Sequence, residues 1–290
     1  MNNRLKNIII RFICLFIPNK KYRRNFRKKL LEKYIKFPYK ITPEFMSSSA
    51  PKVSVVIPVY NQYDFTVECL KSIAYYRPEV PFEIIIADDA STDKTRNIEQ
   101  EINGIRVIRT PGNYGFLKNV KNTIPYAKGE YIFLMNNDML VTEGWLDSLY
   151  KTITSDDKIG IVGSLNLNID GSIQEFGSAL DKNARSHINK IKNIKPEELN
   201  AKEVQYCSGC SILFSKTDWE SLGGFDDRFC PAYYEDTDFN FSMQYILGKK
   251  IICQPKSKIY HIRSLTYSTE GQKLSEKNRI QFLEKWGDKL

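Results

Sequence analysis

Three polar residues, Asn136, Asn137 and Asp138, directly follow the apolar run Tyr131–Met135. Such a run is typical of a short buried strand, so the polar residues would stand at the carboxyl end of a sheet. Open α/β sheets bind their ligands at that edge. One carboxylate beside two amides suits a hard divalent cation that also holds a substrate phosphate. An ordinary Asn/Asp-rich turn gives the same pattern, so the rest of the chain must decide between the two.

Two other apolar runs also end in polar residues. Asn61 follows residues 53–60, and Asp88 and Asp89 follow residues 82–87. A carboxylate at the end of a strand is in a position that favours ligand binding. It could instead cap the turn that follows the strand.

Glu235, Asp236 and His261 are further candidates for chemistry in the second half of the chain. The two carboxylates stand at the start of a helical pattern, where they could supply a general base or simply cap the helix. The helix dipole would lower their pKa values, whereas each carboxylate raises the pKa of its neighbour. An imidazole could complete a metal site, and it would favour Mn²⁺ over Mg²⁺. An ordinary histidine at a strand end is the alternative.

Alternating strand and helix patterns connect the clusters in the first half of the chain. Strands are predicted at residues 53–60, 82–87, 105–108 and 131–135, and helices at residues 65–76, 94–102 and 117–127. This order predicts a parallel sheet with right-handed crossovers. The polar ends of all four strands, including the Gly-rich loop 111–116, should therefore converge at one edge of the sheet.

The second half of the chain has a less regular pattern. Strands are predicted at residues 159–162, 206–214, 250–253 and 257–261, a hairpin turn at residues 170–171, a mobile loop over residues 181–203, and helices over residues 236–247 and 272–290. Cys207 and Cys210 form a lone Cys-x-x-Cys pair, and no second pair completes a zinc site, so we expect both to pack in the interior. Trp145 and Trp219 are also expected in the core.

The polar clusters occur in an order that resembles the family 2 glycosyltransferases, which have the GT-A fold. The matching segments are Val53–Asn61, Ile84–Asp93, Asn113–Phe116, Leu134–Asp138, Leu222–Asp226, Glu235–Phe239 and His261. Each segment alone is a weak signal, but the ordered set from residue 53 to residue 261 is specific. The Asn-Asn-Asp form and the segment Gly171–Gly177 look most like the rhamnosyltransferase-like, surface-polysaccharide branch.

The resemblance implies an inverting transfer of a sugar from a UDP- or dTDP-sugar to a hydroxyl of a glycan or lipid-linked acceptor in bacterial surface polysaccharide synthesis. It implies that Asp138 and His261 bind Mn²⁺ or Mg²⁺, that Asp236 is the general base with Glu235 beside it, and that Asp88 reads the nucleobase. The other residues expected to bind the nucleotide-sugar are Pro58, Tyr60, Asn61, Asn113, Gly115, Lys118, Asn136 and Asn137.

Asn136 departs from the family pattern, because an acid is usual at this position. An amide adds no charge, so Asp138 should carry the cation almost alone, and metal affinity should be weak without the nucleotide. The substitution leaves open a nucleotide-sugar-binding protein without activity, although Glu235, Asp236 and His261 are all present. Donor hydrolysis that depends on Mn²⁺ would separate these two hypotheses.

Positive charge is concentrated at the start of the chain. Thirteen of the 43 Lys and Arg residues lie in residues 1–40, beside the single acid Glu32, whereas the net charge of the whole chain is +9. The apolar residues 8–17 contain Arg11, and they are too few to span a bilayer, which needs about 20 apolar residues. Basic residues beside bulky apolar ones favour an anionic membrane surface. Nucleic acid, which needs only charge, is the alternative partner and is not expected.

These patterns divide the chain into a basic amphipathic, helical, membrane-associating arm with a linker at residues 1–46 and a GT-A domain at residues 52–290. The domain has a nucleotide-binding half at residues 52–140, an acceptor-binding half at residues 141–270 and a C-terminal helix at residues 271–290. The six scattered cysteines indicate reduced thiols. We therefore expect a cytoplasmic protein that is peripheral on the inner face of the cytoplasmic membrane.

Overall fold

The computed structural model describes residues 42–46, 48–169, 171–188, 196–262 and 269–290. The predicted basic arm at residues 1–40 lies outside these residues. The strands are β1 (Val53–Val59), β2 (Phe82–Asp88), β3 (Ile105–Arg109), β4 (Tyr131–Met135), β5 (Met139–Val141), β6 (Ile159–Leu167), β7 (Ile173–Glu175), β8 (Ser178–Leu180), β9 (Ser186–Ile188), β10 (Lys202–Glu203), β11 (Ser211–Ser215) and β12 (Lys250–His261).

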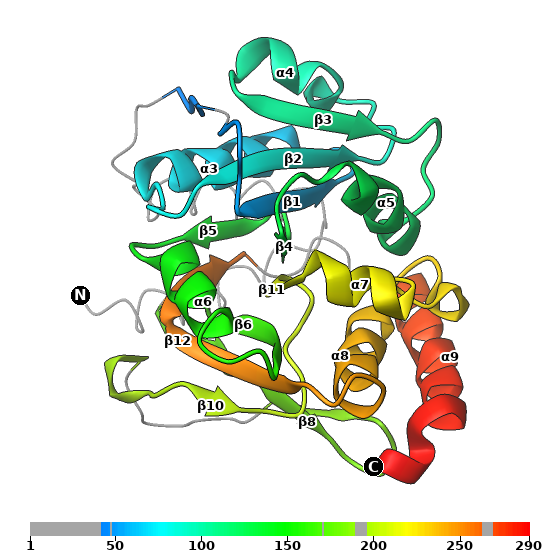
Figure 1. Ribbon diagram of the computed structural model, residues 1–290. Coiled ribbons are helices and arrows are strands. Elements are labelled where there is room, and N and C mark those ends of the chain that lie inside the picture. Colours follow the sequence, from blue (N-terminus) through cyan, green and yellow to red (C-terminus); the bar gives the residue numbers. More distant parts are fainter. Residues whose placement is uncertain (1–41, 47, 170, 189–195, 263–268) are drawn as a thin grey trace, which may run out of the picture.

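Helices cover both faces of the main sheet (Figure 1). They are α3 (Tyr63–Tyr75), α4 (Ile98–Glu101), α5 (Phe116–Thr123), α6 (Trp145–Ile153), α7 (Lys216–Leu222), α8 (Glu235–Tyr245) and α9 (Thr269–Trp286). Core residues of α3, α4 and α6 pack together on one face, and core residues of α5, α7, α8 and α9 pack on the other. Within the described part of the chain, no helix is both long and apolar enough to cross a bilayer.

The main sheet has the strand order β10-β12-β6-β11-β4-β1-β2-β3, with β5 paired to β12 and β7 paired to β6. Strands β3, β2, β1 and β4 are parallel. Strand β11 is antiparallel to both β4 and β6, and β12 is parallel to β6. The ends of β4, β6 and β12 therefore lie at the same edge of the sheet, beside the start of β11. This mixed, mainly parallel sheet with flanking helices confirms the predicted fold class.

Burial on both faces explains the apolar runs of the central strands. In β1, Val55 and Ile57 pack into the core that contains Leu70 of α3, whereas Val56 packs into the opposite core with Leu117 of α5. Alternate residues of a strand point to opposite faces, so a strand covered on both sides needs apolar residues throughout. Trp145 and Trp219 are buried in these two cores, as predicted.

Two predicted elements are shorter in the structure. The helix predicted at residues 94–102 is a 3-10 turn, Lys94–Asn97, followed by the short helix α4. The carboxylate of Asp93 accepts a hydrogen bond from the backbone N–H of Thr95 at 2.9 Å, and this local cap closes the tighter turn. The strand predicted at residues 206–214 begins only at Ser211, because residues 207–210 form a loop that leads into β11.

Other predictions in the second half need correction. Residues 250–261 form one strand, β12, whose register with β6 is irregular between Gln254 and Lys258, where two separate strands were expected. Residues 181–203, expected to be a mobile loop, contain β9 and β10, which pair with β8 and β12. The predicted hairpin turn is confirmed, since β6 pairs antiparallel with β7 across Gly171, whose φ is 78°. Strand β5 and helices α6 and α7 were not predicted.

Candidate functional site

Asp138 and His261 meet at the edge where β4 and β12 end. Strand β5, which starts directly after Asp138, pairs antiparallel with the end of β12 and sets Met139 opposite His261. Atom Nε2 of His261 lies 3.4 Å from Oδ1 of Asp138, and both side chains are about 15% exposed. The fold thus brings together the two residues that are expected to bind a cation.

The imidazole of His261 is held from its other side by Gln174. Oε1 of this amide lies 2.8 Å from Nδ1 of His261, so Nδ1 donates a proton and Nε2 faces Asp138. Burial lowers the pKa of His261, but the hydrogen bonds with Asp138 and Cys210 outweigh burial and raise it to about 10. The raised pKa reflects the attraction between the imidazole and the carboxylate of Asp138.

The donor atoms of Asp138 and His261 fit a borderline cation such as Mn²⁺, which accepts both oxygen and imidazole nitrogen. In the described ranges, no group of three His, Cys, Asp or Glu side chains is placed to hold a metal ion. If Asp138 and His261 bind a cation, its other positions would be filled by water or by a phosphate-bearing ligand.

Asn136 and Asn137, which precede Asp138, are hydrogen-bonded to other segments of the fold. The backbone N–H of Asn136 donates to the carbonyl oxygen of Cys210 at 3.0 Å, and this bond ties β4 to the loop before β11. Nδ2 of Asn137 donates to Oγ1 of Thr66 on α3 at 2.9 Å. Both residues are partly buried, next to Asp138. Their contacts fix the position of the turn that carries the carboxylate.

The first carboxylate at the end of β2, that of Asp88, is bonded to other groups of the protein. Asp88 is fully buried, and its Oδ2 accepts a hydrogen bond from Nε of Arg109 at 3.0 Å. Its Oδ1 accepts one from the backbone N–H of Ser91 at 3.0 Å. A buried carboxylate with these partners orders the loop after β2. The expected contact of Asp88 with a nucleobase remains a prediction, and the geometry here favours an indirect role.

Asn61 and Asp89 order the two neighbouring loops. Oδ1 of Asn61 accepts hydrogen bonds from the N–H groups of Thr92 and Asp93 at 2.8 and 3.0 Å. The carboxylate of Asp89 accepts the N–H of Gly115 at 2.8 Å. The loops that follow β1, β2 and β3 are therefore bonded to one another along the expected ligand-binding edge.

The other residues expected to bind a nucleotide-sugar border these loops. Pro58 is partly buried in β1, and Tyr60 directly after this strand is 48% exposed. Asn113 and Lys118 are exposed, on the loop after β3 and on α5. Gly115 lies between them with φ of 83°, in the left-handed region that favours glycine.

Asp236 lies in the first turn of α8, against the loop before β11. Its Oδ2 accepts the N–H of Gly209 at 2.8 Å, and its Oδ1 accepts the N–H of Thr237 at 2.7 Å. The preceding residues, Tyr233 and Tyr234, have φ values of 75° and 71°, which non-glycine residues seldom adopt outside functional sites.

The neighbouring carboxyl of Glu235 is in a different environment. Glu235 is 6% exposed, and burial, followed by the charge on Asp236, raises its pKa well above the usual value. Among the described residues its Oε2 has no hydrogen-bond partner. The sequence predicted that one of two adjacent carboxylates would have a raised pKa, and in the structure this carboxyl belongs to Glu235.

Helix α9 fixes the loop that leads to Asp236. Nδ2 of the fully buried Asn278 lies within 3.0 Å of the carbonyl oxygens of Phe229, Ala232 and Tyr233. Nε1 of Trp286 donates to the carboxylate of Asp238 at 2.7 Å. This predicted C-terminal helix therefore supports α8, and nothing in its charged sequence marks Asn278 as the residue that makes these contacts.

Cys207 and Cys210 are buried in the loop before β11, as predicted, and both thiols are free. Nδ2 of Asn166 donates to Sγ of Cys210 at 3.3 Å. The hydrogen bond with Cys253, and secondly burial, raises the pKa of the Cys207 thiol. Cys207 packs in the core that contains α8, whereas Cys210 packs in the core on the opposite face of the sheet. Gly209 lies between them in the loop that contacts Asp236.

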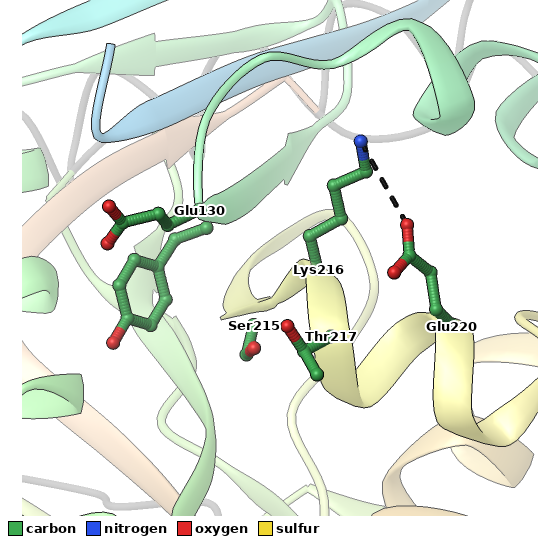
Figure 2. A pocket seen from close by; sticks show the side chains of 6 residues that line it. Glu130, Ser215, Lys216, Thr217 and Glu220 are labelled. Atoms are coloured by element: carbon green, nitrogen blue, oxygen red, sulfur yellow. Dashed lines mark ion pairs between the residues drawn. The ribbon is translucent and has the colours of Figure 1, made fainter. Parts of the chain in front are cut away.

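A separate hollow lies at the opposite edge of the sheet (Figure 2), and its lining residues are Glu130, Tyr131, Ser215, Lys216, Thr217 and Glu220. Tyr131 begins β4 and pairs with Ser215 at the end of β11, so this hollow lies at the other end of these strands from Asp138. Lys216 is satisfied there, since it donates to the carbonyl oxygen of Ala127 at 2.8 Å and pairs with Glu220. The expected site residues gather at the first edge.

The sheet and the strand-end site define a protein with a GT-A-like fold. Residues 54–223 match the model of the family described as Glycosyl transferase family 2. The chain therefore belongs to glycosyl transferase family 2, as its motifs predicted. The matched segment includes Asp138 and ends before α8, so Asp236 and His261 lie beyond it.

Relatives and solved structures agree with this assignment. A segment of 128 residues is 32% identical to glycosyltransferase GlyG of Streptococcus pneumoniae serotype 4, and it covers 43% of this chain and 42% of that protein. A segment of 228 residues is 26% identical to the O-antigen biosynthesis protein RfbC of Myxococcus xanthus, and it covers 74% of this chain and 17% of that protein. The chain thus spans less than half the length of each.

A solved structure of GalNAc-T7 with UDP, GalNAc and Mn²⁺ has the same fold, with a TM-score of 0.67. The sequences are 18% identical, and the match covers 82% of this chain and 49% of the other.

Proposed function

We propose that this protein is an inverting glycosyltransferase that moves a sugar from a nucleotide-sugar to a hydroxyl of a glycan or lipid-linked acceptor. The observation that carries the proposal is the pairing of Asp138 with His261, 3.4 Å apart, at the edge where the loops after β1, β2 and β3 are bonded together. Asp236 lies beside the same edge through its hydrogen bond with Gly209 of the loop before β11.

In this proposal Asp236 accepts the proton of the acceptor hydroxyl as the oxygen attacks the anomeric carbon of the sugar. The bond from that carbon to the new oxygen forms while the bond to the diphosphate oxygen breaks. The nucleoside diphosphate leaves from the opposite face, so the configuration inverts. A cation held by Asp138 and His261 would neutralise charge on the leaving diphosphate.

The donor that we propose is a UDP- or dTDP-sugar, and the proposed cation is Mn²⁺ or Mg²⁺. The support is the two-ligand site with its imidazole, together with the UDP and Mn²⁺ bound by GalNAc-T7. A role in surface polysaccharide synthesis of the rhamnosyltransferase-like type is supported by the Gly171–Gly177 segment and by the O-antigen relative. A thermal-shift panel of UDP-, dTDP- and GDP-sugars with Mn²⁺ would identify the donor.

The substitution Asp236→Asn tests the assignment of the base. It keeps the side chain's size but removes its ability to take a proton, so kcat should fall by about 10²–10⁴-fold. Binding of UDP with Mn²⁺, measured by calorimetry, should remain within about twofold of wild type. Asp227→Asn, a change at a carboxylate that is 67% exposed, is the matched control. Turnover near the wild-type value in Asp236→Asn would show that another group acts as base.

We also propose that residues 1–40 bind the anionic inner face of the cytoplasmic membrane, where a lipid-linked acceptor would be found. The support is the thirteen Lys and Arg residues interleaved with apolar ones. Deleting residues 1–40 should abolish sedimentation with anionic liposomes. Unchanged sedimentation, or binding to duplex DNA with a steep salt dependence, would contradict the membrane proposal.

A further inference from the structure

Two adjacent residues of β7, Gln174 and Glu175, contact opposite ends of the candidate site. Gln174 binds His261, and Glu175 binds the loop that holds Asp236. Both residues lie in the segment Gly171–Gly177, which resembles the surface-polysaccharide branch of the family. The pairing of β7 with β6 brings the segment to the ligand-binding edge.

Gln174 fixes the ring of His261 through a directed contact. The amide is 8% exposed, and its Oε1 lies 2.8 Å from Nδ1 of His261, while its Nε2 donates to Oδ1 of Asn168 at 3.3 Å. The second bond orients the amide, so that the oxygen faces the imidazole. The Nδ1 proton is thereby held on the Gln174 side, and Nε2 is left free for Asp138 or for a metal ion.

Glu175 is hydrogen-bonded to the Ser208–Gly209 loop, which precedes β11. Its Oε1 accepts the backbone N–H of Ser208 at 3.2 Å, and the next N–H, that of Gly209, donates to Oδ2 of Asp236 at 2.8 Å. Two carboxylates therefore hold consecutive N–H groups of one loop. Burial, with the charge of Asp236 as a further cause, raises the pKa of Glu175, and this agrees with a position close to the base.

We infer that Gln174 and Glu175 are positioning residues, one for cation binding and the other for the general base. Gln174 sets the imidazole of His261 for cation binding, and Glu175 sets the Ser208–Gly209 loop so that Asp236 is aimed at the acceptor hydroxyl. The inference rests on the proposed function, because it assumes that His261 and Asp236 have the roles given there. One short strand, β7, would thus position both the histidine that binds the cation and the carboxylate that acts as base.

Substitutions of Gln174 should act on cation binding. Gln174→Leu has a similar volume but offers no acceptor, so Mn²⁺ affinity in the presence of UDP, measured by calorimetry, should fall by about 10–100-fold. UDP binding without metal should not change. Gln174→Glu keeps an oxygen acceptor beside Nδ1, so it should restore most of the Mn²⁺ affinity.

Substitutions of Glu175 should act on turnover alone. Glu175→Ala should lower kcat by at least about tenfold, because small displacements of a catalytic group reduce the rate strongly. The donor KM and the Mn²⁺ affinity should stay within about twofold of wild type. Glu175→Gln keeps the acceptor for Ser208 and should recover most of kcat. Glu203→Gln, at an exposed carboxylate of β10, is the control.

The Gln174 variants must change the Mn²⁺ affinity, and the Glu175 variants must change kcat without changing that affinity. If Gln174→Leu and Glu175→Ala lose cation affinity and kcat to the same extent, or if the conservative variants recover neither, the strand has only a general structural role and the inference fails. Thermal melting of each variant identifies that case. A failure of the proposed function is distinct, because Asp236→Asn would then keep its turnover whatever the β7 variants do.

Discussion

Nε2 of His261 lies 3.4 Å from Oδ1 of Asp138, although the two residues belong to opposite halves of the chain. The contact depends on β5, which starts next to Asp138 and pairs with the end of β12. A cation bound there would have one carboxylate from the protein, because Asn136 stands where the related enzymes usually have an acid. Asp138 should therefore supply most of the negative charge that the protein offers to a bound cation.

Asp138→Ala should be the most damaging change in the Asn136–Asp138 segment. Loss of the single carboxylate should reduce Mn²⁺ affinity in the presence of UDP by at least about 100-fold, since hard cations depend on charged oxygen ligands. Asn136→Ala removes no charge and should reduce it by less than about tenfold. Titration of Mn²⁺ into each variant with saturating UDP measures both values. Equal losses in the two variants would mean that Asn136 ligates the cation as strongly as Asp138.

Gly115→Ala should weaken donor binding. A Cβ at this position would lie 2.4 Å from Cβ of Pro231, and φ is +83°, so the loop would have to move. Strain of about 1–2 kcal/mol is expected, which corresponds to roughly a tenfold rise in the UDP dissociation constant. Gly112→Ala is the matched control in the same loop, because its Cβ would meet nothing closer than 3.5 Å. Equal UDP affinities in the two variants would refute the prediction.

Gly209→Ala should reduce turnover and leave donor binding intact. A Cβ here would lie 2.7 Å from Cβ of Asp236, so the carboxylate or the loop must shift. A displacement near 1 Å can lower the rate by about 10²-fold. Steady-state kinetics with the donor varied should show a lower kcat at unchanged KM. Gly287→Ala, where a Cβ would meet nothing within 4 Å, should leave both constants unchanged. A raised donor KM in Gly209→Ala would place Gly209 at the donor site instead.

The sequence predicted the sheet and the edge at which its polar strand ends meet, because parallel strands impose strong local patterns. Runs such as Val53–Tyr60 are mainly apolar, and each ends abruptly in polar residues. The crossover rule then places those ends together without knowledge of any side-chain contact. Asp138 could be selected on this basis.

The remainder of the site depends on contacts between distant segments, which carry no local signal. Arg109 forms an ion pair with the buried Asp88, and the spacing of the two residues in the sequence does not predict this contact. Gln174 and Glu175 lie in a strand of three residues, too short for its alternation to be recognised. The need for glycine at position 209 becomes clear only from the structure, in which Asp236 lies against it.

Glu235 gives the site a pH-dependent effect on stability. Burial, and secondly the charge on Asp236, raises its pKa in the folded protein above the value near 4.3 expected for the unfolded chain. Between these two values the folded state binds more protons, so stability should fall as the pH rises above about 4.3. The decrease ends once the pH exceeds the pKa of Glu235 in the folded protein.

Glu235→Gln should remove this effect, because the amide stays neutral at every pH. The variant should be more stable than wild type at pH 8 by at least about 1 kcal/mol, and the difference should shrink towards pH 5, since a rise of one in pKa corresponds to about 1.4 kcal/mol. Chemical denaturation at both pH values measures the free energy of unfolding. Glu143→Gln, at an exposed carboxylate, should follow wild type. If Glu235→Gln shows the same pH dependence as wild type, ionisation of Glu235 does not destabilise the folded state. Its Oε2, which has no hydrogen-bond partner among the described residues, would then have to bind water in solution.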